Sequence, residues 1–405
     1  MELLRHYFVT VLLACLGMAI LLPGSSCRTR LSMPHDPGDR RQWTTAGGEE
    51  EHRGFSSERL ILPLELGWQA RTRGSVVASP TVIGEMVCVG TLGKRFYFFS
   101  AVDGRQQGVL KTDAGISSSA AAGEGSVYLA TGADEGNVCA LDLRNGEIRW
   151  KTDVGDVSAA LTYHRGYLLV STNEGLIHCL AAGDGSRRWQ FTARGMRTTA
   201  TAIYDGMAVC GCDGGYLYAL GIEDGAERWR RQLDGAVWSR PSIADGRIYV
   251  GTFEGHLSCL ETNDGEVIWQ QELKGGITHP PALGGEMVFV GTDRGLVSAF
   301  DRDSGRMIWE NRLNDARPGT PLVTLDALLV GGSDGLLRAL STPTGDLLWS
   351  HQVEGAIVSA PVLSQGRLYL GSMADYVYGF SSAGSEAIAD SSGVDPFGDV
   401  GSPSP

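Results

Sequence analysis

Five side chains stand out as candidates for binding chemistry, because most copies of the same segment elsewhere in the chain hold small residues. They are Arg197, Trp238, Arg240, His279 and Arg317. Arginine and tryptophan are enriched in the hot spots of protein interfaces. We therefore expect these side chains to form one binding surface. The competing interpretation is that they fill space and neutralise nearby carboxylates.

The sequence contains motifs that resemble catalytic or metal-binding ones, but their position or a missing residue does not fit those roles. Gly331-Gly332-Ser333-Asp334-Gly335 matches the Gly-x-Ser-x-Gly pattern of serine nucleophiles, but it falls in a turn between two expected strands, whereas a nucleophile elbow joins a strand to a helix. Residues 301–305 begin like a calcium loop, yet no glutamate follows at the required distance. The eight histidines show no metal-ligand spacing, and no Cys-x-x-Cys occurs. We predict no catalytic residue and no metal site.

A repeat of about 40 residues defines the elements that position the five candidates. From Trp150 to Trp349 a tryptophan recurs at intervals of 39 or 40 residues. Within each period, short runs of Val, Ile, Leu, Tyr and Ala alternate with Asp-Gly, Asn-Gly or Ser-Gly steps, a pattern typical of strands joined by tight hairpins. Four strands per period predict a propeller blade. The tryptophans expected to pack between neighbouring blades are Trp68, Trp150, Trp189, Trp229, Trp269, Trp309 and Trp349.

The number of repeats predicts an all-β, eight-bladed propeller over residues 60–384. Eight copies of the third strand are recognisable, and the last copy stops at Ala383-Gly384 before it reaches a tryptophan. Residues 66–70 read like a fourth strand without its blade. We therefore expect this N-terminal strand to complete the eighth blade, which leaves no long unpaired strand edge. Leu110 stands where a tryptophan is expected, so one contact between blades is weakened.

Residues 140–150 resemble the tryptophan-docking motif, Ala-x-Asp-x-x-x-Gly-x-x-x-Trp, of quinoprotein-type (PQQ-like) repeats. Residues 299–309 repeat the motif, whereas Gly221, Glu261 and Ser341 replace the aspartate in other copies. Enzymes of that family bind calcium through acidic and amide side chains in the central funnel, and many carry a ring of adjacent cysteines. This chain has no Cys-Cys pair and no such set of funnel residues. We expect neither PQQ nor calcium as a cofactor.

The N-terminus reads as a secretory signal over residues 1–26, with Arg5 and His6 ahead of an apolar stretch. Cys27 follows three small residues and resembles a bacterial lipidation site, although Gly24 replaces the usual leucine. Ordinary cleavage after Ser26 is the alternative. Cys15 has the better upstream sequence, but cleavage there leaves a very short apolar core. A lipid on Cys27 followed by Arg28 would direct the protein to the outer membrane.

The remaining composition restricts the class of partner. Residues 27–59 lack periodicity and are expected to form a flexible tether, and residues 385–405 a disordered acidic tail. The formal net charge of −13 argues against nucleic acid. Most cysteines in strands are expected to act as small buried apolar residues, and a Cys210–Cys212 disulfide would be strained.

The resemblance implies a monomeric, non-catalytic propeller that serves as a periplasmic interaction scaffold. Lipoproteins of this repeat family assist the assembly of outer-membrane β-barrel proteins, and the expected partner is a periplasmic or outer-membrane protein such as a β-barrel insertase. The alternative is a propeller that binds a small molecule or a glycan, including a PQQ-dependent oxidoreductase.

Overall fold

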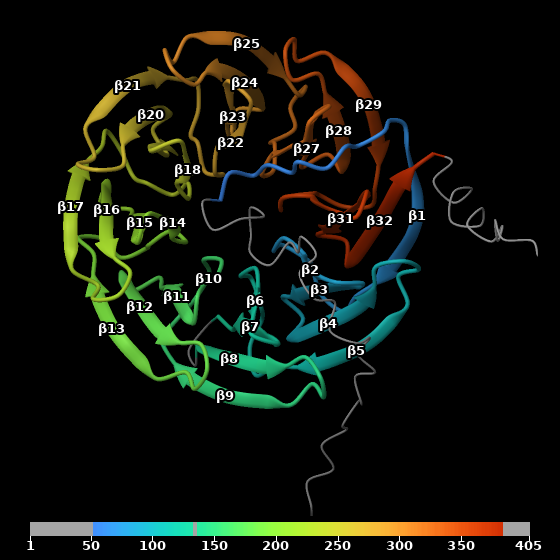
Figure 1. The fold of residues 1–405 in the computed structure, drawn as a ribbon. Coiled ribbons are helices and arrows are strands. Elements are labelled where there is room, and N and C mark those ends of the chain that lie inside the picture. The colour runs from blue at the N-terminus through green and yellow to red at the C-terminus, as the bar shows by residue number, and fades with distance from the viewer. Residues whose placement is uncertain (1–51, 133–135, 384–405) are drawn as a thin grey trace, which may run out of the picture. The chain divides into compact units, whose positions relative to one another are not determined.

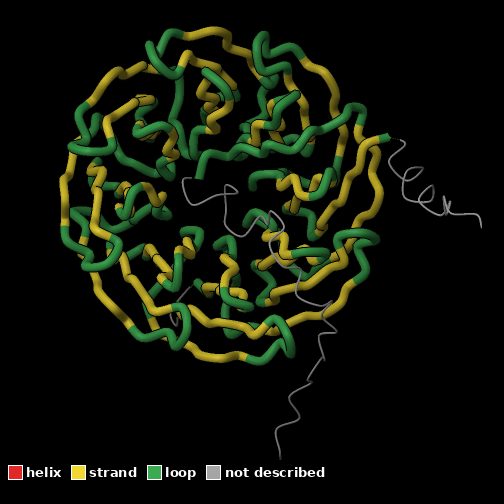
Figure 2. The backbone as a smooth tube through the Cα atoms, viewed as in Figure 1, coloured by secondary structure: helices red, strands yellow, loops and turns green. Residues whose placement is uncertain are grey.

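The computed structural model describes residues 52–132 and 136–383. The predicted signal peptide, the candidate lipidation site Cys27 and the predicted acidic tail lie outside the described residues. Within the described part every regular element is a strand, as the tube in Figure 2 shows. Accordingly, the described residues contain no helix that is long and apolar enough to cross a membrane.

The strands form eight four-stranded antiparallel sheets, which are arranged as the blades of a ring (Figure 1). Blade 1 contains β2 (Thr81–Ile83), β3 (Met86–Thr91), β4 (Arg95–Ser100) and β5 (Gln106–Lys111). Blade 2 contains β6 (Ala121–Gly123), β7 (Ser126–Ala130), β8 (Asn137–Asp142) and β9 (Ile148–Asp153). Blade 3 contains β10 (Thr162–His164), β11 (Tyr167–Ser171), β12 (Leu176–Ala181) and β13 (Arg187–Thr192). Blade 4 contains β14 (Ala202–Tyr204), β15 (Met207–Gly211), β16 (Tyr216–Gly221) and β17 (Glu227–Gln232).

The second half of the ring repeats this order. Blade 5 contains β18 (Ser242–Ala244), β19 (Arg247–Gly251), β20 (His256–Glu261) and β21 (Val267–Glu272). Blade 6 contains β22 (Ala282–Gly284), β23 (Met287–Gly291), β24 (Leu296–Asp301) and β25 (Met307–Arg312). Blade 7 contains β26 (Leu322–Val323), β27 (Leu328–Gly331), β28 (Leu336–Leu340) and β29 (Leu347–Gln352). Blade 8 contains β30 (Val362–Ser364), β31 (Arg367–Ser372), β32 (Tyr376–Ser382) and β1 (Leu64–Arg71).

The predicted closure by the N-terminal strand is confirmed. β1 pairs with β32 in antiparallel register, from Leu64 opposite Ser382 to Arg71 opposite Tyr376. The first strand of the chain therefore supplies the outer strand of blade 8. Trp68 of β1 then joins blade 8 to blade 1, because its indole Nε1 donates a hydrogen bond to the Ala101 carbonyl at 3.2 Å.

The recurring tryptophans lie on the outer strands and each joins its own blade to the next. In six cases the indole Nε1 donates to a backbone carbonyl 32 or 33 residues further along the chain. The glycine of the following blade's motif lies against the indole ring. Gly265, for example, has a φ of +70°, and a Cβ there would lie only 2.7 Å from the ring of Trp229. Glycine and tryptophan therefore recur together because the ring leaves no space for a side chain.

The core is formed by the strand faces that neighbouring blades press together. Leu110 packs there in place of a tryptophan, against a buried cluster that includes Phe98 and Leu141. The six cysteines of the described residues are all buried and unpaired, so Cys210 and Cys212 form no disulfide in this structure. Burial raises the pKa of the Cys179 thiol to about 12, which keeps it a neutral, small apolar side chain.

The prediction of a flexible tether is wrong for its last residues, because residues 52–59 pack against the ring. His52 is fully buried, and its Nε2 lies 2.7 Å from the Thr201 carbonyl oxygen of blade 4. Val323 of blade 7 donates to the Gly54 carbonyl, and Ser56 N donates to the Val323 carbonyl, each at 2.8 Å. In Figure 1 this segment crosses the ring from its centre towards β1. The sequence pattern misses it because its contacts are made with distant blades, not within a repeat.

Candidate functional site at the channel mouth

The centre of the ring holds a cavity of about 400 Å³, which is lined by the segments that lead into the innermost strands. Because every blade contributes the same short segment, equivalent positions of all eight repeats face one another across this space. Most of them are alanine, serine, threonine or valine. The exceptions occur on adjacent blades, where large side chains reduce the opening on one side.

The structure brings the five predicted residues together. Arg197, Trp238, Arg240 and His279 line the central cavity. Trp238 and His279 also line a second cavity of about 460 Å³, and Arg317 is part of that lining. The five residues precede the innermost strands of blades 4 to 7, so they occupy a continuous part of the channel rim.

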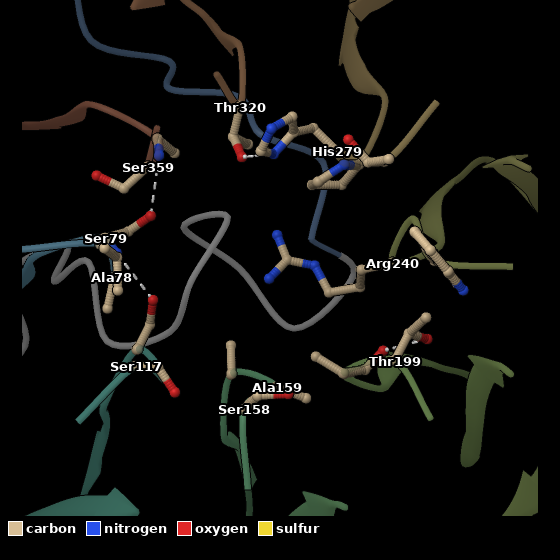
Figure 3. A pocket seen from close by; sticks show the side chains of 18 of the residues that line it. Ala78, Ser79, Ser117, Ser158, Ala159, Thr199, Arg240, His279, Thr320 and Ser359 are labelled. Atoms are coloured by element: carbon tan, nitrogen blue, oxygen red, sulfur yellow. Dashed lines mark hydrogen bonds between the residues drawn. The ribbon is translucent and has the colours of Figure 1, made fainter. Parts of the chain in front are cut away.

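Arg240 extends into the middle of the central cavity, as Figure 3 shows. Its Nε atom is buried and has no hydrogen-bond partner among the residues that the structure describes. Burial lowers the pKa of the guanidinium to about 10, so Arg240 keeps its charge at neutral pH. A charge that is half-buried without a partner is costly, so Arg240 is not expected to stabilise the fold.

His279 lies on the same side of the cavity, next to Thr320 (Figure 3). Its Nδ1 lies 3.0 Å from the Thr320 hydroxyl oxygen. Burial lowers the pKa of the imidazole to about 4, because the surroundings disfavour the charged form. At neutral pH His279 is therefore an uncharged group, and the positive charge of the rim comes from its arginines.

An aromatic and cationic stack lies at the cavity mouth. The rings of Trp238 and Phe253 are 4.2 Å apart between centroids, and the Arg197 guanidinium carbon lies 5.6 Å from the centre of the Trp238 ring. The exposed fractions of Trp238 and Phe253 are 37% and 40%. A large aromatic surface is thus held in place by its neighbours and still accessible to a partner.

Sequence reasoning missed Phe253, although the sequence contains a signal for it. Phe253 occupies the position in the turn between the second and third strands of its blade that is taken by Asn173, Asp213 and Asp293 elsewhere. An aromatic residue in place of these polar ones has no structural reason in the turn itself. Met373 holds the equivalent position in blade 8 and is 45% exposed. It also lines the second cavity.

The carboxylates of these turns do not neutralise the rim arginines. Those of Asp213, Glu254 and Asp293 each accept a hydrogen bond from a backbone N–H of the adjoining loop, at 2.7 to 2.8 Å. Asp334 is paired with Arg338. The turns therefore use their acidic residues to fix loops, and Arg197, Arg240 and Arg317 have no carboxylate partner among the described residues.

The central cavity does not have the donor set of a calcium site. Its lining contains no carboxylate and no side-chain amide, which are the oxygen ligands that calcium takes in proteins. Across residues 52–132 and 136–383, no group of three or more His, Cys, Asp or Glu side chains could hold a metal ion. The chemistry that the cavity offers is that of a cation with hydroxyl groups, which suits an anion.

Comparison with known proteins identifies relatives of this fold. The model of the family described as outer membrane protein assembly factor BamB matches residues 65–172, 134–236, 173–258, 213–323 and 293–387. BamB from Moraxella catarrhalis has 20% sequence identity and a TM-score of 0.70, over 79% of this chain and all of that chain. None of the curated proteins matches this chain in sequence.

Two oxidoreductase structures share the fold. Quinohemoprotein alcohol dehydrogenase from Comamonas testosteroni has 15% identity and a TM-score of 0.73, over 84% of this chain and 80% of that chain. A europium-containing methanol dehydrogenase has 13% identity and a TM-score of 0.71, over 85% of this chain and 98% of that chain. At such identities these likenesses establish the architecture only.

Proposed function

Since this chain belongs to the family of the outer membrane protein assembly factor BamB, we propose that it is a non-catalytic periplasmic scaffold in outer-membrane β-barrel assembly. It docks a protein partner through the mouth of its channel. The observation that carries the proposal is the exposed stack of Arg197, Trp238 and Phe253. Trp238 stands where blades 3, 4 and 6 have Ser158, Thr198 and Thr278, so its ring is an addition to the fold.

The chemistry of the stack defines the partner surface. A half-exposed tryptophan and phenylalanine favour an apolar side chain, and arginines without a carboxylate partner among the described residues favour an acidic one. The partner surface should therefore combine apolar and acidic residues. A β-barrel insertase with a periplasmic region of this kind is the partner class that the family supports.

The docking proposal is tested by crosslinking in cells. A photoreactive amino acid at Phe253 should capture one protein of the outer-membrane assembly machinery, identified by mass spectrometry. The matched control is the same amino acid at Leu347, which is 60% exposed on the outer strand of blade 7. Equal capture of that protein from both positions, or capture of no assembly protein from position 253, would contradict the proposal.

Attachment to the membrane is a second, separable part of the proposal. We expect Cys27→Ser to move the protein from the membrane to the soluble periplasmic fraction while its melting temperature is unchanged. The measurement is fractionation followed by thermal melting of the purified protein. If Cys27→Ser stays in the membrane and Cys15→Ser is released, the lipid is carried by Cys15.

The residues that line the central cavity do not support a role as a PQQ-dependent enzyme. The central cavity that contains Arg240 has no carboxylate in its lining among the described residues, and calcium takes oxygen ligands of that kind. We therefore propose no catalytic role.

A further inference from the structure

The central cavity contains the charge of Arg240, which is not part of the stack of Arg197, Trp238 and Phe253. Arg240 points into the cavity (Figure 3). The chain has 47 acidic residues against 34 lysines and arginines, so it has more than enough carboxylates to form an ion pair with every arginine, Arg240 included. Among the described residues none lines the cavity. The guanidinium, with its planar set of N–H donors, is thus presented to the interior of the cavity itself.

The hydroxyl groups of the lining are arranged to donate hydrogen bonds as well. Ser79 Oγ accepts from Ala360 N at 3.1 Å, and Ser119 Oγ accepts from Ser79 N at 3.0 Å. With one lone pair engaged by a backbone N–H, each of these hydroxyls retains its own hydrogen for another acceptor. Ser359 Oγ is buried without a hydrogen-bond partner among the described residues. The lining that these serines share with Arg240 includes no carboxylate among the described residues.

The N-terminal segment crosses the channel next to this cavity. Ser242 Oγ, two residues after Arg240, donates to the His52 carbonyl at 3.0 Å. Thr162 Oγ1, two residues after Ala160 of the lining, lies 3.1 Å from His52 Nε2. The ring and backbone of His52 thus occupy the channel just beyond the lining residues, which limits solvent on that side. Exclusion of water strengthens a charge-assisted hydrogen bond.

We propose that the central cavity binds a small organic carboxylate, held by Arg240 with Ser79, Ser119 and Ser359 as further donors. A planar carboxylate matches the fork of the guanidinium, which donates two parallel hydrogen bonds. The volume of about 400 Å³ lies within the range of small-molecule sites, and the alanine and valine side chains of the wall contact a short carbon skeleton. The proposed site shares Arg197 and Trp238 of its lining with the docking stack, whereas Phe253 does not line the central cavity.

The test is calorimetric titration of the mature protein with acetate, succinate and citrate, and separately with inorganic phosphate. We expect succinate or citrate to bind and Arg240→Met to weaken that binding by at least about tenfold, because a charge-assisted hydrogen bond is lost. Arg306→Met, which removes an exposed arginine away from the cavity, is the matched control and should bind like the wild type. Phe253→Ala should also retain carboxylate binding, which separates this site from the docking surface.

Thermal melting in the absence of ligand shows whether Arg240 serves the fold instead. Because Arg240 Nε is buried without a hydrogen-bond partner among the described residues, we expect Arg240→Met to melt at the same or a higher temperature than the wild type. If Arg240→Met does not fold, Ser359→Ala carries the test, with an expected weakening of several-fold. The proposal is overturned if no carboxylate binds up to about 10 mM, if phosphate alone binds, or if the folded Arg240→Met or Ser359→Ala variant used binds as tightly as the wild type.

Discussion

Deletion of residues 60–72 is expected to open the ring and lower the melting temperature by about 10 °C or more. The deletion removes β1, which forms the whole outer strand of blade 8, and with it the contact of Trp68 with blade 1. Loss of a fully buried tryptophan costs about 3–5 kcal/mol of the free energy of unfolding; Trp68 is half-buried, and the deletion also removes the buried side chains of Leu60 and Leu64. For a domain of this size each kcal/mol corresponds to roughly 2–4 °C.

The deletion should also change the state of association. With β1 absent, the backbone N–H and C=O groups of β32 that pair with it become an unpaired strand edge, which favours association between chains. Circular dichroism melting and light scattering after size exclusion measure the two effects. Deletion of residues 385–405 is the control and should leave both unchanged. If the two truncated proteins melt at the same temperature and both remain monomeric, closure by β1 does not stabilise the ring.

Trp238→Ala is expected to weaken binding of the protein partner by about 2 kcal/mol or more, which is about thirtyfold in the dissociation constant. The physical reason is the loss of the aromatic surface that Arg197 and Phe253 hold in place. Since Trp238 is 37% exposed and the same position in other blades is small, the melting temperature should fall little. Arg197→Ala should act in the same direction with a smaller effect.

A second tryptophan provides the matched control for this prediction. Trp229 is only 9% exposed, and its Nε1 donates to the Thr262 carbonyl at 2.8 Å. Trp229→Ala should therefore cost about 3–5 kcal/mol of stability and leave the affinity of the folded fraction unchanged. The measurements are thermal melting and titration with the partner identified by crosslinking. If Trp238→Ala and Arg240→Ala weaken folding and leave partner binding intact, these side chains fill the channel and the interface lies elsewhere.

The sequence alone determined the architecture, because the fold repeats a local pattern. Each blade is encoded by its own hairpins, and the spacing of Trp150 to Trp349 sets the number of blades. The unmatched strand around Trp68 predicted the closure that the pairing of β1 with β32 confirms. The regular repeat placed Arg197 and Arg317 at equivalent positions of blades 4 and 7, so the symmetry of a ring puts both at the same end of the channel.

The tertiary structure alone decided what those positions can bind. Whether Arg240 has a carboxylate partner depends on side chains from other blades, and the turn carboxylates are engaged by loop N–H groups instead. The stacking of Phe253 on Trp238 and the burial of His52 likewise join residues outside the repeat pattern. Periodicity records which residues form strands, because that is a local property of the backbone. The pairing of charges and rings across the channel depends on long-range packing, which no local pattern encodes.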